Sequence, residues 1–242
     1  MWLTSLTRAV PQDHSQTGWY QEFIRRRRPD YLFSWQVYSE ILEGNLKCRK
    51  SWLDLGCGNN IIIEENRIEG FKVGLDSSVR PDLKSKDFCA GEVYHLPFRQ
   101  GSFDLISCRY LLEHLAEPAR IFEEVSRILK PEGTFLLQTT NRKNLWIKLS
   151  ALVPFELKRY LFDRFHLAEI TGLEKTHYRM NFPELFPNFV CGMKLEKLYL
   201  MEDLLRFGKL IFWGSYLHLQ ILDGLGLGGF KSNIISVYRK LP

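Results

Sequence analysis

Residues 51–60, Ser-Trp-Leu-Asp-Leu-Gly-Cys-Gly-Asn-Asn, join an apolar run to an acid and two closely spaced glycines. A strand that enters a tight glycine turn and then a helix brings backbone N–H groups against a ligand, because glycine has no side chain to hold the ligand away. Asn60 stands where a nucleotide-binding turn usually carries a third glycine. The Gly-x-Gly pattern on its own is also compatible with an ordinary turn.

Asp76 lies 20 residues after Gly56, at the end of the next apolar run, Phe-Lys-Val-Gly-Leu-Asp. An acid at that distance can accept both hydroxyls of an adenosine ribose. Its alternative role is to cap a helix over residues 77–83. Asp54, inside the turn, would repel a pyrophosphate, which disfavours a nicotinamide dehydrogenase with a degenerate loop. The same acid suits a cationic sulfonium ligand that carries an ammonium group.

Four segments, taken in order, resemble the motifs of the class I S-adenosylmethionine-dependent methyltransferases, in particular the small-molecule branch often called type 11. They are LDLGCGNN, VGLDSS, GEVYHLPFRQGSFDLISCRYLLEHL and EVSRILKPEGTFLLQTTN, and together they cover about residues 50–141. The resemblance implies S-adenosyl-L-methionine as the cofactor and methyl transfer to a small-molecule acceptor as the activity. A non-catalytic protein of the same fold, binding the cofactor or acting as an interaction subunit, is the alternative.

The resemblance also implies which residues hold the cofactor. Asp54 and the glycines would shape the methionine pocket, Asp76 would hold the ribose, and the remainder would line the adenosine and sulfonium sides. The implied set is Asp54, Gly56, Cys57, Gly58, Asn60, Asp76, Ser77, Glu92, Val93 and Arg109. Asn60, Glu92 and Glu132 depart from the glycine, aspartate and glycine usual in the family. Because asparagine tolerates positive φ better than most residues, we expect Asn60 to make the same turn, with its amide near the methionine tail.

The residues for chemistry and acceptor binding are expected in two later stretches. Methyl transfer from a sulfonium is an in-line displacement, so alignment of the reactants supplies most of the catalysis. An acceptor oxygen or nitrogen can also need a general base. His114, in Leu-Leu-Glu-His-Leu, is the catalytic candidate, with a structural histidine beneath a cap as the alternative. The substrate-binding candidates are His177, Tyr178, Arg179 and Asn181, with a loop network as the alternative; His166 is left open between a helix surface and the pocket.

Strand-like and helical segments alternate around these residues. Strands are expected at 51–55, 71–76, 102–108, 133–139, 194–201 and 232–240, and helices at 30–42 and 117–129. This alternation indicates crossover units and a parallel sheet. We therefore predict an α/β fold with a doubly wound, seven-stranded, mostly parallel sheet, Rossmann-like, with N-terminal helices and an inserted helical cap. The expected division of this single domain, 1–242, is a helical segment 1–50, a cofactor-binding core 51–141, a cap insertion 142–188, and late strands with an intervening helix 189–242.

Composition limits the compartment and the partners. Five cysteines without a C-x-x-C pair indicate neither a disulfide framework nor a metal site, and together with no recognisable signal peptide they favour the cytoplasm. The net charge of +5 is mild, and its one concentrated run, Arg25–Arg28, fits a solvated turn or an anionic partner. Nucleic acid is not favoured as a partner. The oligomeric state stays open.

Two apolar, aromatic segments, residues 144–162 and 210–222, have two interpretations. They can form the core of the cap, or they can line a pocket or a peripheral membrane contact for a lipid-linked or glycan-linked acceptor. Neither segment is long enough without interruption to span a membrane.

Overall fold

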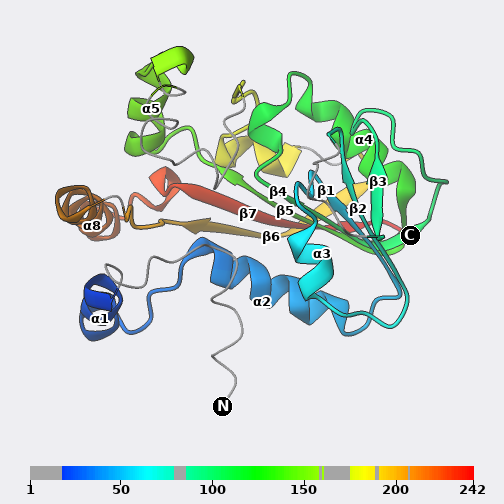
Figure 1. The fold of residues 1–242 in the computed structure, drawn as a ribbon, viewed down its shortest axis with the longest axis horizontal. Helices are drawn as coiled ribbons and strands as arrows, with labels where there is room; N and C mark the ends of the chain where they lie inside the picture. Colours follow the sequence, from blue (N-terminus) through cyan, green and yellow to red (C-terminus); the bar gives the residue numbers. More distant parts are fainter. Residues whose placement is uncertain (1–17, 79–85, 158–159, 161–174, 189–190, 207) are drawn as a thin grey trace.

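The computed structural model describes residues 18–78, 86–157, 160, 175–188, 191–206 and 208–242. Seven strands form one sheet in the order β3-β2-β1-β4-β5-β7-β6 (Figure 1). Neighbouring strands are parallel except β7, which runs antiparallel to both β5 and β6. The strands are β1 Ser51–Leu55, β2 Phe71–Asp76, β3 Phe88–Ala90, β4 Phe103–Arg109, β5 Leu129–Thr140, β6 Met193–Met201 and β7 Asn233–Lys240. The predicted seven-stranded, mostly parallel sheet is confirmed.

Helices cover both faces of the sheet. The α-helices are α1 Gly18–Arg27, α2 Ser34–Leu46, α3 Ile61–Glu65, α4 Pro118–Ile128, α5 Leu145–Leu152 and α8 Lys209–Gly224, and the 3-10 helices are η1 Leu112–His114, η2 Pro183–Asn188 and η3 Gly228–Phe230. Figure 1 shows α4 above the sheet and α2 and α3 below it. Every residue of β1 is buried, as expected of a strand covered on two sides.

Alternate residues of the central strands enter two different apolar clusters. Leu53 and Ile106 pack with Phe122 of α4 in one cluster, whereas Trp52 and Leu105 pack in the other with α2 and α3. Successive side chains of a strand point to opposite faces, so the two clusters are the two filled sides of one sheet. A third cluster lies apart from both and joins α1 to α8 through Tyr20, Ile24, Leu204, Phe212 and Leu219.

The carboxyl ends of the parallel strands share one edge of the sheet. The first residue of β7, Asn233, pairs with Thr140 at the end of β5 and with Met201 at the end of β6. The helices that follow β5 and β6, namely α5 and α8, therefore start at this edge, and Figure 1 shows them with α1 beyond it. Crevices at this edge are where open α/β sheets bind ligands.

Three details differ from the sequence prediction. The helix expected at 30–42 is α2, which begins at Ser34 because the Gln36 side chain accepts from the Phe33 N–H. β5 begins at Leu129, four residues before the start of the strand expected at 133–139. β3 was not predicted, since three residues carry too little pattern.

Part of the predicted cap lies outside the described residues. The structure places α5, η2 and the segment 175–188 within the range 142–188. Residues 158–159 and 161–174, with His166, are outside the description, as are residues 1–17 of the predicted helical segment.

Candidate cofactor and acceptor site

The glycine loop after β1 is held against the end of β2. The N–H groups of Gly56 and Cys57 both donate to the carbonyl of Leu75, at 2.8 and 3.2 Å. Gly56 and Gly58 have φ values of +68° and +55°, in the left-handed region that side chains disfavour. A Cβ on Gly56 would also lie 3.2 Å from the Leu111 side chain. The loop thus needs both glycines, and its backbone lies open to the carboxyl edge.

Asn60 makes the turn that a third glycine would make. Its φ is +59°, which confirms the expected backbone conformation. Its side chain is fully buried, however, and the amide Nδ2 donates to the carbonyl of Asp87 at 2.8 Å. The amide therefore points between β2 and the entry to β3. The expectation that it lies near the methionine tail is wrong, because these backbone partners draw it into the fold.

Gly74 of β2 makes the room for this arrangement. A Cβ at Gly74 would lie 1.9 Å from Asn60 Oδ1 and 2.7 Å from Cys57 Sγ. Both contacts are far shorter than atoms tolerate, so a side chain there would force the loop to move. The Asn60 side chain therefore occupies the space that Gly74 leaves by having no Cβ. Neither residue on its own indicates this contact in the sequence.

Asp76 is positioned by the loop that it follows. Its Oδ2 accepts from the Gly58 N–H at 2.9 Å, and its Oδ1 accepts from the N–H and hydroxyl of Ser78 at 3.1 and 3.2 Å. The side chain is only partly buried, and Ser77 beside it is exposed. A carboxylate offers about four acceptor directions, so Asp76 retains capacity for a ligand hydroxyl. The helix that it might instead have capped falls mostly in residues 79–85, outside the description.

The turn after β3 lies next to Asp76. The Gly91 N–H donates to the Asp76 carbonyl at 3.0 Å. Glu92 is exposed, whereas Val93 is buried in the cluster on the α4 side. The loop residues, Asp76 and this turn thus follow consecutive neighbours in the sheet, β1, β2 and β3.

Asp54 is a buried acid directly beneath the glycine loop. It is 2% exposed, and its Oδ1 accepts from the Ser107 hydroxyl at 2.5 Å. That hydroxyl in turn accepts from the Trp52 indole N–H at 2.8 Å. Burial raises the pKa of Asp54 to about 6, although the Ser107 hydrogen bond and the Arg109 charge act in the opposite direction. The fold therefore holds a carboxylate whose charge is poorly compensated by the protein.

Arg109 ends β4 beside this acid. Its guanidinium carbon lies 5.9 Å from the ring centroids of both Tyr38 and Tyr110, within the range of cation–π attraction. The Tyr110 hydroxyl in turn donates to Asn233 Oδ1 and accepts from the Gln138 amide, both at 2.9 Å. Arg109 thus packs against two tyrosine rings beside the gap between β1 and β4. This is the topological switch point of the sheet, where the order of the strands changes direction.

His114 and Glu113 lie on η1, above the ends of β4 and β5. His114 Nδ1 is 3.1 Å from the carbonyl of Lys175. A carbonyl can only accept, so Nδ1 carries the proton and Nε2 carries the lone pair in the neutral ring. Glu113 is 4% exposed, and its Oε2 accepts from the Thr139 hydroxyl at 2.8 Å. Burial raises the pKa of Glu113. The sequence analysis did not single out Glu113, although its place beside His114 was a usable signal.

The four residues predicted to bind substrate have different environments. The N–H groups of His177 and Tyr178 donate to the Glu113 carbonyl at 2.7 and 3.1 Å, so both half-buried residues lie against η1. Arg179 is exposed. Asn181 is fully buried, and its Nδ2 donates to the Thr139 hydroxyl at 2.7 Å and the Thr140 carbonyl at 3.0 Å. The prediction that Asn181 contacts substrate is corrected, because its amide ties this segment to the end of β5.

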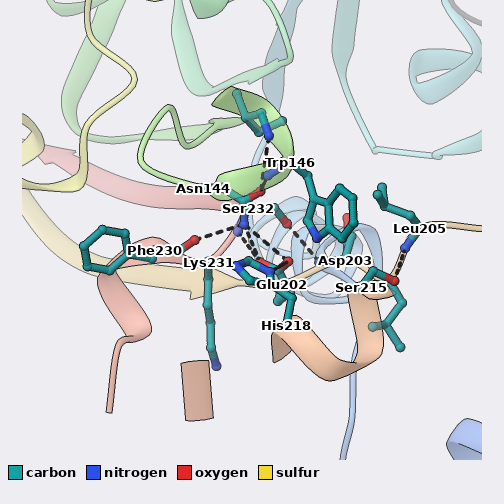
Figure 2. A network of polar contacts seen from close by, with 12 residues as sticks. Asn144, Trp146, Glu202, Asp203, Leu205, Ser215, His218, Phe230, Lys231 and Ser232 are labelled. Atoms are coloured by element: carbon teal, nitrogen blue, oxygen red, sulfur yellow. Dashed lines mark hydrogen bonds and ion pairs between the residues drawn. The ribbon is translucent and has the colours of Figure 1, made fainter. Parts of the chain in front are cut away.

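A second buried acid, Glu202, directly follows β6 at the carboxyl edge of the sheet (Figure 2). It is 2% exposed. Its carboxylate accepts from the Asn144 amide at 3.0 Å and from the Ser232 N–H at 2.6 Å, and His218 Nδ1 of α8 lies 3.1 Å away. Burial raises the pKa of Glu202. The members of this group are scattered along the chain and no motif connects them, so the sequence did not predict it.

A cavity of about 380 Å³ lies beside this second acid and away from the glycine loop. Basic and acidic side chains both line it, so it has no clear preference for an anion or a cation. Its lining residues are Arg27, Arg28, Pro29, Asp30, Tyr31, Leu32, Met201, Glu202, Leu219, Asp223 and Lys231. Within the part of the chain that the structure describes, no group of three or more His, Cys, Asp or Glu side chains is placed to hold a metal ion.

Comparison with known families identifies this arrangement. The family described as "Methyltransferase domain" matches residues 20–178, well over half of the chain. The chain belongs to the S-adenosylmethionine-dependent methyltransferases. A methyltransferase structure from Mesorhizobium loti superposes with a TM-score of 0.55 at 19% identity, covering 85% of this chain and 97% of that one. One from Methanosarcina mazei gives 0.53 at 20% identity, covering 87% and 99%. At such identities these two show the methyltransferase fold alone.

Curated relatives carry a more specific name. The ubiquinone biosynthesis O-methyltransferase of Sodalis glossinidius is 32% identical over 105 residues, which is 38% of this chain and 42% of that protein. The Pectobacterium carotovorum enzyme of the same name is 24% identical over 179 residues, 63% of this chain and 75% of that protein. The match thus spans less than half the length of the first of these relatives.

The family and the fold imply S-adenosylmethionine as the cofactor. The residues present fit that group. Gly56, Cys57 and Gly58 are only partly buried, Asp76 has acceptor capacity for hydroxyls, and Asp54 lacks full compensation of its charge.

Proposed function

We propose that this methyltransferase methylates an oxygen atom of a small-molecule acceptor, free or linked to a lipid or glycan. The observation that carries the proposal is the hydrogen bond from Gly58 to Asp76, which joins the glycine loop and the acid at the ends of β1 and β2. Oxygen is proposed as the acceptor atom because the relatives described above are named O-methyltransferases.

The chain's own residues would bind the cofactor in three groups. Asp54 would face the ammonium of the methionine part, whose positive charge offsets the cost of burying the Asp54 carboxylate. Arg109 would lie near the carboxylate of the methionine part.

Asp76 and Ser77 would hold the ribose. Val93 would contact the adenine, with Glu92 at its polar edge. Gly56, Cys57 and Gly58 would present backbone, and Asn60 would fix the turn from behind. When bound, the cofactor would supply a methyl group on a sulfonium, from which a neutral thioether is a good leaving group.

His114 would serve as the general base for an acceptor hydroxyl. Its Nδ1–H is directed to the Lys175 carbonyl, so Nε2 is the nitrogen that can take a proton. His177 and Tyr178, which lie against η1, would flank the acceptor, and Arg179 would lie at the solvent side.

Two alternatives make different predictions for binding. A dehydrogenase would bind NAD, but Asp54 beneath the loop opposes a pyrophosphate. A non-catalytic protein would bind the cofactor, or nothing, without turnover. Asn60 is the feature that supports this second alternative, although its φ of +59° allows the same turn that a glycine would make.

Calorimetry with S-adenosylmethionine, S-adenosylhomocysteine and NAD tests the cofactor part of the proposal. We expect the first two to bind and NAD to give no heat. Incubation with small-molecule extract and S-adenosylmethionine, followed by mass spectrometry, tests the acceptor part. Binding of NAD alone would refute the methyltransferase assignment, and cofactor binding without any methylated product would favour the non-catalytic protein.

A further inference from the structure

Helix α8 is apolar on two opposite faces, although it lies at the surface. Its inner face buries Phe212, Ser215, Leu219 and Leu222. Its outer face exposes Leu210, Trp213, Leu217 and Ile221, which follow one another at helical spacing. Leu210 is 87% exposed and Leu217 is 61% exposed. A helix that is apolar all round is normally covered on all sides, so the outer face of α8 is suited to an apolar contact.

Helix α5 extends the same surface. Trp146 of α5 packs edge-on against the His218 ring of α8, with centroids 6.3 Å apart, and its indole also lies next to Gly214. None of the residues of α5 is buried, and Leu145, Leu149 and Leu152 are 48%, 46% and 77% exposed. Single exposed apolar side chains are common, but a contiguous group on two packed helices marks an interaction surface.

The charged and aromatic residues around this surface indicate the chemical class of the partner. Across α1, α5 and α8 there are five basic side chains, Arg25, Arg26, Arg27, Lys148 and Lys209, against two acidic ones, Glu22 and Asp223. Trp19 of α1 contacts Trp213, with centroids 6.3 Å apart, and both indoles are partly exposed. Apolar side chains bordered by tryptophan and by lysine or arginine are the pattern of helices that lie in a membrane interface and respond to anionic lipid.

We propose that the outer faces of α8 and α5, with the basic end of α1, dock this protein on the surface of an anionic lipid bilayer. No helix among the described residues has the length and apolar character to cross a membrane, so the contact is peripheral. The docking face lies at the carboxyl edge of the sheet, the edge that also carries the glycine loop. The proposal concerns binding alone and does not depend on methyl transfer.

Co-sedimentation with vesicles tests the proposal without cofactor. The full chain is mixed with vesicles of phosphatidylcholine alone or of phosphatidylcholine with phosphatidylglycerol. We expect binding to the anionic vesicles, with weaker binding to the neutral ones. Raising NaCl from about 0.1 M to about 1 M should release much of the bound protein, because the screening length falls from about 10 Å to about 3 Å.

Matched variants locate the contact. Leu210→Asn combined with Leu217→Asn should lower the partition coefficient by about tenfold or more, since each leucine loses its insertion into the interface. Leu241→Asn is the control: Leu241 is 50% exposed and follows β7 at the opposite edge of the sheet. Thermal unfolding should be the same for both variants and the wild type. Lys148→Gln with Lys209→Gln should reduce the preference for anionic over neutral vesicles.

Three results would overturn the docking surface. The wild-type chain could fail to bind either kind of vesicle. The leucine pair and the Leu241 control could lose binding equally. The chain could also form a dimer in sedimentation velocity that the leucine pair disrupts, with no vesicle binding by either form, which would assign the surface to self-association. None of these results bears on cofactor binding, so failure here is distinguishable from failure of the methyltransferase proposal.

Discussion

Replacement of Asp54 by asparagine should stabilise the protein while impairing its function. Burial raises the pKa of Asp54 from 3.8 to about 6. At about 1.4 kcal/mol for each tenfold change in proton affinity, the ionised carboxylate costs the fold about 3 kcal/mol near pH 8. Asparagine has nearly the same shape and retains an oxygen to accept from the Ser107 hydroxyl. Asp54→Asn therefore removes the cost and keeps the contact.

The sign of the effect depends on pH. Above about pH 6 the carboxylate is ionised in both folded and unfolded chains, and the full cost is present. As pH falls from about 6 to about 4, the folded state takes up a proton before the unfolded state does, so the wild type recovers the lost stability. The advantage of Asp54→Asn in free energy of unfolding should therefore be about 3 kcal/mol at pH 8 and near zero at about pH 4.

Urea unfolding of both proteins across this range measures the difference directly. Asp104→Asn is a control of opposite sign. Although partial burial opposes it, hydrogen bonds from Ser51 and Lys130 hold the pKa of Asp104 below its usual value. That variant should be less stable than the wild type at pH 8, and the deficit should fade at low pH. A stability difference for Asp54→Asn that does not change with pH would refute the reasoning.

The remaining predictions concern the loop, the ribose acid, the proposed base and the cap. Asp76→Ala should weaken S-adenosylmethionine binding in calorimetry by about 1.5–3 kcal/mol, the worth of hydrogen bonds to a charged group; unchanged affinity would remove Asp76 from the site. Gly74→Ala should lower the melting temperature and cofactor affinity, because its Cβ would lie 1.9 Å from Asn60 Oδ1, and adding Asn60→Gly should restore part of the loss in a double-mutant cycle. His114→Gln should lower kcat by about 10²–10⁴-fold without changing cofactor affinity; an unaltered kcat would exclude a base at this position. Asn181→Ala should cost about 1–3 kcal/mol of stability, measured by urea unfolding, and a change only in acceptor KM would contradict its structural assignment.

The sequence predicted the core of the fold well for a physical reason. Strands buried on both sides are largely apolar runs, and β1 and β4 stand out as such, whereas β2 is buried only over Val73–Leu75. The acid at the end of β2 was likewise found by its distance from Gly56. β3, with three residues, lacks enough pattern to be recognised, and its place beside β2 is given by the pairing of Phe88–Ala90 with Gly74, Leu75 and Asp76.

Side-chain direction was the part that the sequence could not supply. The backbone of Asn60 was predicted correctly from its tolerance of positive φ, yet its amide turned into the fold because Gly74 leaves space there. Asn181 has the residue type of a ligand-binding group, but a buried polar network uses the same types. A polar residue in an aromatic segment therefore predicts a buried or a ligand contact equally well until its neighbours are known.

Polar clusters whose residues lie far apart in the sequence could not be predicted from it, for the same reason. Glu202 and His218 belong to different elements and gave no local signal. The buried carboxylate at the end of β6 became apparent only when the three segments that contact it, around Asn144, His218 and Ser232, were in place.

That carboxylate also has a consequence for the order in which the chain assembles. Glu202 gathers Asn144, His218 and Ser232 around one site, although Ser232 lies 88 residues after Asn144 in the sequence. On a translating ribosome the strands that precede Asn144 can pair early, but the segment around Asn144 reaches this site only after Ser232 has been made. We therefore expect the part of the carboxyl edge around Glu202 to close later than the pairing of β1, β2 and β4, and to stay accessible to chaperones until then.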